Sequence, residues 1–204
     1  MTMKTLLGGL PVLLAMVLTS CSKTDMGASA MEKQINLVET ALGQARSWHV
    51  SSTFAVGGET SHLEEDLGCP FNYHRIGKIP DRPQNEIIAT QKGYYYREDD
   101  RWNVLHPPPN DYCKDGPGAG AFPFAVTLEM LKSHTSLKRA DTQSIDGAPC
   151  REFDFIGVAS PREKVGSLCI DEQTNLPFEF RYRNDVYRYS KWNEPVTLEP
   201  PPGL

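Results

Sequence analysis

The sequence predicts a mainly β domain built on one antiparallel sheet, with two helices. Three observations predict this class. Most segments beyond residue 47 alternate apolar and polar residues, which is the period of a half-buried strand. Short turn signals containing Gly, Asn or Asp separate these segments. Helical spacing of apolar residues occurs at only two places in the chain.

Residues 1–20 are expected to form a secretory signal. Lys4 supplies the positive charge, and the apolar run at 6–17 is shorter than the roughly 20 residues that span a bilayer. The run ends in Leu18-Thr19-Ser20-Cys21, which resembles the bacterial lipobox. In that family the signal is cut before the Cys, which is then acylated. Cys21 is therefore the expected lipidation site.

Residues 21–28 are polar or small and predict a flexible tether behind the lipid. Acyl groups such as palmitate on Cys21 would hold the protein stably on a membrane. Two or more acyl chains anchor a protein stably, whereas a single chain binds a membrane only marginally. Ser22 follows the Cys, and the sorting rule of the lipoprotein family then favours the outer membrane, facing the periplasm. The expected location is the cell envelope.

The domain over 29–204 opens with a helix. Ser29 and Glu32 fit a capping box, and apolar residues then recur at spacings of three and four: Met31, Ile35, Val38, Leu42 and Ala45. This pattern predicts a helix with one buried face that ends near Ser47.

Alternation then predicts a succession of strands. They are expected at 48–56, 61–67, 71–76, 86–91, 93–97, 101–105, 137–143, 150–158, 167–171, 178–183 and 186–192. Gly57-Gly58 and Asp146-Gly147 are expected hairpin turns. A Pro- and Gly-rich irregular loop is expected at 106–123, a short helix at 126–134, and an irregular proline-rich tail after residue 192.

Four cysteines remain after Cys21, and an even count in an exported chain predicts two disulfides. Spacing alone allows three pairings. Cys150 and Cys169 fall on the polar face of neighbouring predicted strands, where a cross-strand bridge can form, and this leaves Cys69 with Cys113. A metal site is the poorer interpretation, because the sequence has no Cys-x-x-Cys and its histidines are scattered singly.

Composition argues against several functions. The net charge is −5 and no basic cluster occurs, so nucleic acid is not an expected partner. No nucleophile, phosphate-binding or zinc-protease motif occurs, so we expect no enzyme activity, no cofactor and no metal. The acidic run Glu64-Glu65-Asp66 is expected to be a solvated strand end, and the histidines are expected to be surface or loop residues without acidic partners.

The order of elements resembles a known superfamily. A helix leads into Trp48-x-Val50 and a Gly-turn hairpin, a tyrosine-rich strand pair precedes Trp102, and the segment 170–177 runs from a strand through a turn to Leu-Pro. This order is similar to the LolA/LolB-like and LppX/LprG-like domains of bacterial envelopes. The resemblance implies a curved half-barrel sheet with both helices on its concave side. It also implies an apolar cavity that binds acyl chains or other envelope lipids.

If a cavity exists, strand parity predicts its lining. The residues expected to contact lipid are Leu42, Phe54, Val56, Leu63, Met130, Phe153, Phe155, Leu168, Ile170, Phe180 and Tyr182. The same pattern also fits an ordinary core. Tyr94 and Tyr96 are expected on one face and Tyr95 on the other, with a cavity rim as the functional interpretation.

The sequence therefore predicts a membrane-anchored envelope lipoprotein that binds a lipid or lipoprotein acyl chain, for lipid handling or lipoprotein sorting. The alternative is a non-enzymatic sensor or assembly module that binds another envelope protein. The tether and the irregular loop at 106–123 motivate that alternative.

Overall fold

The computed structural model describes residues 28–98, 100–105, 136–156 and 163–203. Within these residues the chain forms one helix, α1 (Ala28–Gln44), and eleven strands. The strands are β1 (Ser47–Val56), β2 (Glu59–Gly68), β3 (Asn72–Lys78), β4 (Asn85–Thr90), β5 (Gly93–Glu98), β6 (Arg101–Leu105), β7 (Ser136–Ile145), β8 (Ala148–Ile156), β9 (Lys164–Asp171), β10 (Pro177–Tyr182) and β11 (Asp185–Ser190).

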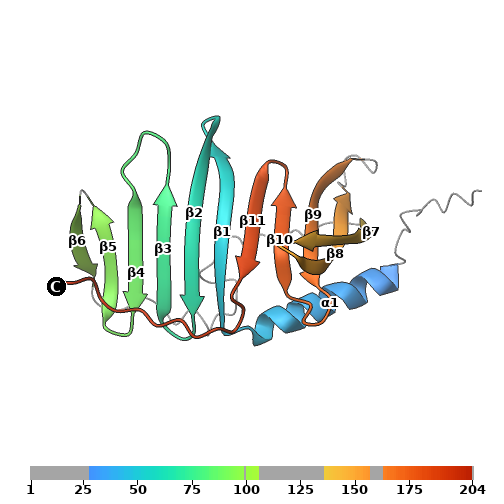
Figure 1. Cartoon of the computed structure of the whole chain (residues 1–204), viewed down its shortest axis with the longest axis horizontal. Helices are drawn as coiled ribbons and strands as arrows, with labels where there is room; N and C mark the ends of the chain where they lie inside the picture. Colours follow the sequence, from blue (N-terminus) through green and yellow to red (C-terminus); the bar gives the residue numbers. More distant parts are fainter. Residues whose placement is uncertain (1–27, 99, 106–135, 157–162, 204) are drawn as a thin grey trace, which may run out of the picture.

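All eleven strands belong to one antiparallel sheet in the order β6-β5-β4-β3-β2-β1-β11-β10-β9-β8-β7. Every predicted strand is confirmed, with end points that shift by a few residues. The sheet is open, with β6 and β7 at its two edges (Figure 1). The predicted loop at 106–123, the short helix at 126–134, Met130 and Cys113 lie outside the described residues, as does the segment 1–27.

Two hairpin turns follow the sequence prediction closely. Gly57 and Gly58 join β1 to β2 with φ angles of 62° and 89°, and Asp146 and Gly147 join β7 to β8 with φ angles of 50° and 85°. Two successive positive φ angles match the twist of the flanking strands, and glycine adopts them without steric cost. These turns hold each strand pair in the register that its side-chain alternation requires.

Alternation places the apolar side chains on one face of the sheet, against which α1 packs. We call this the interior face. Val38 and Leu42 of α1 belong to one buried cluster with side chains from this face. The cluster includes Trp48, Val50, Leu67, Tyr73, Ala89, Phe153, Phe155, Leu168, Ile170, Phe180, Tyr187 and Tyr189. Burial of this surface is the main favourable term for the fold.

The position of α1 determines which half of the interior face is covered. The helix runs from the foot of β1 past β11, β10 and β9 towards β7 (Figure 1). Its buried stripe contains Val38 and Leu42, as the helical spacing predicts, and Ala45 directly after the helix is also buried. The helix begins at Ala28, so the predicted cap Ser29 lies within its first turn, a shift that is ordinary at helix ends.

The C-terminal segment has no regular secondary structure, as predicted, but it is tied to the sheet. The Asn193 amide donates a hydrogen bond to the Ser47 carbonyl at 2.9 Å, and Asn72 Nδ2 donates to the Val196 carbonyl at 2.9 Å. The segment passes the lower ends of β2 to β5 in Figure 1. It therefore ties the foot of β1 to the strands of the other half of the sheet.

Replacing Phe180 by Ala should cost about 3–5 kcal/mol of unfolding free energy, because a fully buried aromatic ring leaves a cavity. Phe180 packs edge-on to Phe155 with ring centroids 5.9 Å apart. Denaturant unfolding would measure the loss. Phe178→Ala, at a half-buried position of the same strand, is the matched control and should cost clearly less. Equal losses in the two variants would contradict this assignment of the core.

Candidate ligand-binding site

A row of directly opposed residues crosses the interior face from β1 to β5. Val50 pairs with Glu65, Glu65 with Arg75, Arg75 with Ile87, and Ile87 with Tyr96. Residues opposite each other on neighbouring antiparallel strands share one face, with Cβ atoms about 5 Å apart. The row therefore brings two apolar residues, two charged residues and one tyrosine onto one side of the sheet.

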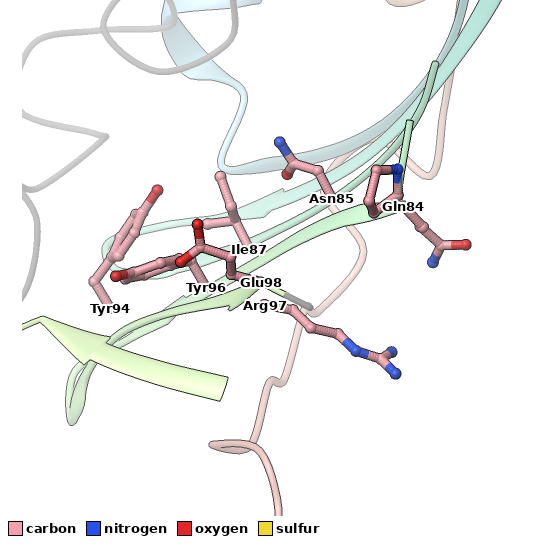
Figure 2. A pocket seen from close by; sticks show the side chains of 8 residues that line it. Gln84, Asn85, Ile87, Tyr94, Tyr96, Arg97 and Glu98 are labelled. Atoms are coloured by element: carbon pink, nitrogen blue, oxygen red, sulfur yellow. The ribbon is translucent and has the colours of Figure 1, made fainter. Parts of the chain in front are cut away.

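A pocket of about 580 Å³ lies at the β4–β5 end of this row. Figure 2 shows Ile87, Tyr94 and Tyr96 side by side, whereas Arg97 points the other way. We call this site the tyrosine pocket; its lining is Pro83, Gln84, Asn85, Ile87, Tyr94, Tyr96, Arg97 and Glu98. The predicted alternation is confirmed, because Tyr95 is buried and the two flanking tyrosines are half-buried. The volume is within the roughly 300–1,000 Å³ of small-molecule sites.

The two halves of the interior face differ in how they are covered. Interior side chains of β8, β9 and β10 are almost fully buried in the cluster to which α1 contributes: Phe153, Phe155, Leu168, Ile170 and Phe180. Ile87, Tyr94 and Tyr96 are only half-buried, and α1 does not extend over β3 to β5 in Figure 1. In the part of the chain that the structure describes, the β4–β5 end therefore offers half-buried apolar surface that lines a pocket.

The predicted lipid contacts lie on the expected face but mostly in the packed half. Six of them are at most 2% exposed and belong to the buried cluster: Leu42, Phe153, Phe155, Leu168, Ile170 and Phe180. Leu63 is buried, Phe54 and Tyr182 are half-buried, and Val56 is 39% exposed. None of these residues lines the tyrosine pocket. Their contact with lipid remains a prediction. Because the six are core residues, substituting them would change the stability of the protein as well as any binding of lipid.

Sequence reasoning missed the charged pair Glu65 and Arg75. Glu65 was expected in a solvated acidic run, yet it is 3% exposed on the interior face. The Tyr73 hydroxyl donates to Glu65 Oε1 at 2.6 Å. Burial raises the pKa of Glu65, and this hydrogen bond and the Arg75 charge only partly offset the effect. Glu65 lies two residues from both Leu63 and Leu67 along β2, so strand alternation places it on the same, interior face. This spacing is the sequence signal that could have located it.

Arg75 lies between Glu65 and the tyrosine pocket. It is directly opposite Ile87 of the lining, and its charge also acts on Tyr94. Burial raises the pKa of Tyr94, and Arg75 opposes that shift. The Arg75 Nε and the Glu65 Oε2 are both buried, and neither has a hydrogen-bond partner within the described residues. Such atoms are rare in folded proteins. Ser52 and Ser61 also have one each, and Glu65 and Arg75 differ from them in being charged residues that are directly opposed.

The opposite, exterior face carries a chain of ionic contacts across β1 to β4. His49 lies between Glu64, at 3.0 Å from Nε2, and Asp66, at 2.8 Å from Nδ1. The His74 Nε2 lies 3.1 Å from Glu86. The expectation that these histidines lack acidic partners was wrong, because cross-strand pairing joins residues far apart in sequence. The contacts are partly solvated, which identifies this face as the outer one.

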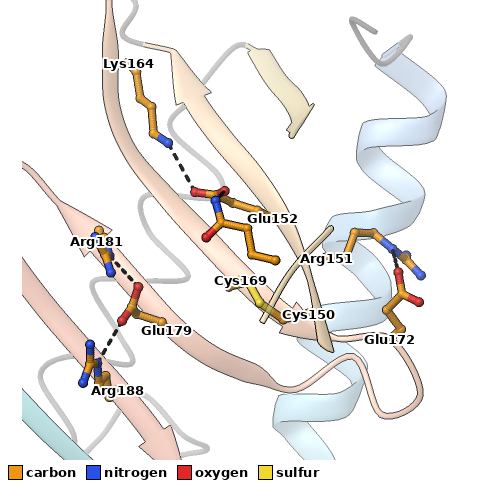
Figure 3. Close-up of a disulfide and its surroundings, with 10 residues drawn as sticks. Cys150, Arg151, Glu152, Lys164, Cys169, Glu172, Glu179, Arg181 and Arg188 are labelled. Carbon is orange, nitrogen blue, oxygen red and sulfur yellow. Dashed lines mark hydrogen bonds and ion pairs between the residues drawn. A yellow bond between two sulfur atoms is a disulfide. The ribbon is translucent and has the colours of Figure 1, made fainter. Parts of the chain in front are cut away.

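The predicted bridge between Cys150 and Cys169 is confirmed, with their Cα atoms 5.6 Å apart (Figure 3). Both cysteines are buried, although their face is polar. Around them, Lys164 contacts Glu152, and both Arg181 and Arg188 bind the buried Glu179. Cys69 is also disulfide-bonded, and its predicted partner Cys113 lies outside the described residues.

Burial by itself raises the pKa of Glu179, but hydrogen bonds from Arg181 and Arg188 outweigh it and leave the pKa below its ordinary value. This carboxylate is therefore ionised and paired at neutral pH. The same region forms a second hollow of about 410 Å³, lined by Gln143, Glu152, Lys164 and Arg181 among others. Its charges already pair with one another, so it offers less to a ligand than the interior face does.

The described residues contain neither a candidate membrane-spanning helix nor a candidate metal site. In the segments that the structure describes, no helix is long and apolar enough to cross a membrane. No three His, Cys, Asp or Glu side chains in those segments are placed to hold a metal ion.

The fold defines the class of protein: an open antiparallel sheet with a helix across one half of its interior face. Two solved structures share it. LprF from Mycobacterium bovis is 15% identical, with a TM-score of 0.57 over 85% of this chain and 98% of that one. The lipoprotein LppX from Mycobacterium tuberculosis is 17% identical, with a TM-score of 0.54 over 85% of this chain and all of that one. The predicted LppX-like fold is thereby confirmed.

No protein-family model matches the sequence, and no curated protein matches it. At 15–17% identity the two structures establish the fold alone. What the site binds must therefore be argued from the residues of this chain.

Replacing Glu65 by Gln should raise stability at neutral pH. Burial holds the folded-state pKa of Glu65 above its ordinary value of 4.5, so the folded protein binds this proton more tightly than the unfolded chain does. The resulting stabilisation is complete below the unfolded pKa and is lost as pH rises through the folded pKa. Gln removes this dependence, so urea unfolding from pH 4 to 8 should show a flatter profile for the variant.

Glu59→Gln is the control for this experiment, because Glu59 is exposed on the same strand. Its stability profile should parallel that of the wild type. A Glu65→Gln profile that also parallels the wild type would show that burial does not disfavour the Glu65 carboxylate.

Proposed function

We propose that this chain is a lipid-anchored protein of the bacterial cell envelope that binds a lipid or an acyl chain in the tyrosine pocket. The single observation that carries the proposal is the half-buried surface of Ile87, Tyr94 and Tyr96, which α1 does not cover, on the interior face of an LppX-like fold. The role is non-enzymatic: the protein holds a lipid for handling or sorting between envelope components.

The chemistry of the pocket suits an acyl chain. Ile87 and the two tyrosine rings supply an apolar wall, and the hydroxyls place polar tips beside it. Asn85, Gln84 and Glu98 make one side polar. A site with an apolar wall and a polar edge favours a molecule that is apolar along its length and polar at one end.

The anchor is proposed from Cys21 and the signal that precedes it. A tether at 21–28 would leave the domain free to turn at the membrane surface while it stays attached. Attachment limits the distance over which the protein can carry a lipid, so it favours a local acceptor or handler. The outer membrane, facing the periplasm, is the proposed location, with Ser22 as its support. That LppX is itself a lipoprotein is consistent with the anchor.

Ile87→Glu should remove co-purified lipid, because a carboxylate in the apolar wall opposes an acyl chain. The full chain would be purified in detergent, extracted with organic solvent and analysed by mass spectrometry. We expect a loss of about tenfold or more, which corresponds to about 1.4 kcal/mol. The matched control is Ile88→Glu, the adjacent position of the same strand on the exterior face.

Both variants carry the same anchor, so membrane lipid that follows the anchor cancels in the comparison. Thermal unfolding would confirm that each variant is folded. Equal lipid in the wild type, Ile87→Glu and Ile88→Glu would exclude the tyrosine pocket as the lipid site.

Cys21→Ala should abolish acylation and release the protein from membranes, because Cys21 is the proposed lipid attachment site. Metabolic labelling with radioactive palmitate and membrane fractionation would measure the two effects. Incorporation of label into the variant at the wild-type level would contradict the lipobox assignment.

A further inference from the structure

Among the described residues, Arg75 lies between the tyrosine pocket and the buried carboxylate of Glu65 on the interior face. Cross-strand pairing places it opposite Ile87 on one side and opposite Glu65 on the other. Its charge acts on both Tyr94 of the pocket and Glu65. Any ligand that fills the pocket and extends inward along this row therefore meets the Arg75 guanidinium.

Part of the hydrogen-bonding capacity of this position is not used by the described residues. Among the described residues, Arg75 takes part in none of the ion pairs found, and its buried Nε has no acceptor. The Glu65 Oε2 likewise has no partner within those residues, whereas Oε1 accepts from Tyr73. A buried donor without an acceptor costs free energy, so a ligand that supplies the acceptor recovers it.

Charge decides which ligand group fits. Burial favours the neutral form of Glu65, because it raises the pKa of that carboxyl group. A carboxylate whose ionised form is disfavoured is a weaker counter-ion for Arg75 than an exposed carboxylate is. A ligand carboxylate accepts hydrogen bonds from a guanidinium, and such charge-assisted bonds are the strong ones.

Resting on the proposed lipid-binding function, we propose that Arg75 forms an anion-binding subsite beside the tyrosine pocket, next to the lining residue Ile87, which takes the carboxylate of a single-chain fatty acid. The acyl chain lies against Ile87, Tyr94 and Tyr96, and the carboxylate accepts a hydrogen bond from the Arg75 Nε. Glu98, the other carboxylate of the pocket, is exposed and lies two residues beyond Tyr96 along β5, at the polar edge.

The test compares two probes of equal chain length, oleic acid and oleyl alcohol, on the full chain at pH 8, where the acid is ionised. Direct binding of radiolabelled probe would give the ratio of the two affinities. We expect the wild type to prefer the acid by about tenfold or more, as one charge-assisted bond implies. Arg75→Met should remove this preference and keep binding of the alcohol.

Arg101→Met is the matched control, because Arg101 is an exposed cation on β6 opposite Glu98. It should keep the preference for the acid. Loss of the preference in this control to the same degree as in Arg75→Met would show a general charge effect and overturn the subsite.

The wild-type measurement is decisive even if Arg75→Met does not fold. Equal affinities for acid and alcohol would overturn the carboxylate subsite and leave lipid binding intact. Absence of binding of either probe would overturn the subsite together with the proposed function. An unchanged ratio in a folded Arg75→Met protein would exclude Arg75 as the residue that recognises the anion.

Discussion

The structure depends on one constraint: a single-layer sheet has an apolar face that must be covered, and in the described part of the chain one helix covers only part of it. Helix α1 packs through Val38 and Leu42 against the half formed by β8 to β11. There the interior side chains are fully buried, as in an ordinary core. At the other end Ile87, Tyr94 and Tyr96 remain half-buried around a pocket. The same face thus supplies stability at one end and, in the proposed function, a binding surface at the other.

Burying a polar group in such a face without a hydrogen-bond partner costs free energy. The positions of these groups therefore help to locate a candidate binding site. Glu65 and Arg75 are directly opposed on β2 and β3, and each has a buried atom that no described residue satisfies. On the exterior face comparable groups are paired, as Glu179 is with Arg181 and Arg188. The contrast separates polar residues that stabilise the sheet from polar residues left available at a site. It is the reason the inner row, rather than the exterior hollow, is the better candidate for recognition.

Similarity to LprF and LppX establishes the fold of this chain. At identities of 15% and 17% it does not establish the ligand or the role. A shared fold hosts many functions, so function must be read from the site. Here the tyrosine pocket combines an apolar wall with tyrosine hydroxyls, and the half-buried cation Arg75 lies beside it, a composition that suits the amphipathic single-chain ligand proposed above. The disulfide between Cys150 and Cys169 lies on the other face and serves the packed half, so it stabilises the scaffold without entering the site.

The sequence by itself determined the strands, the turns at Gly57-Gly58 and Asp146-Gly147, the Cys150–Cys169 pair and the face to which each side chain belongs. These follow from local periodicity, which has a period of two along a strand. Only the tertiary structure decided which part of the face is covered. Residues that line a core and residues that line a cavity show the same apolar alternation along a strand, so the sequence does not distinguish them. Phe155 and Phe180 became core for this reason, and Tyr94 and Tyr96 line the pocket. Strand pairing also placed Arg75 beside Glu65, since cross-strand neighbours depend on register between segments and not on the pattern within one.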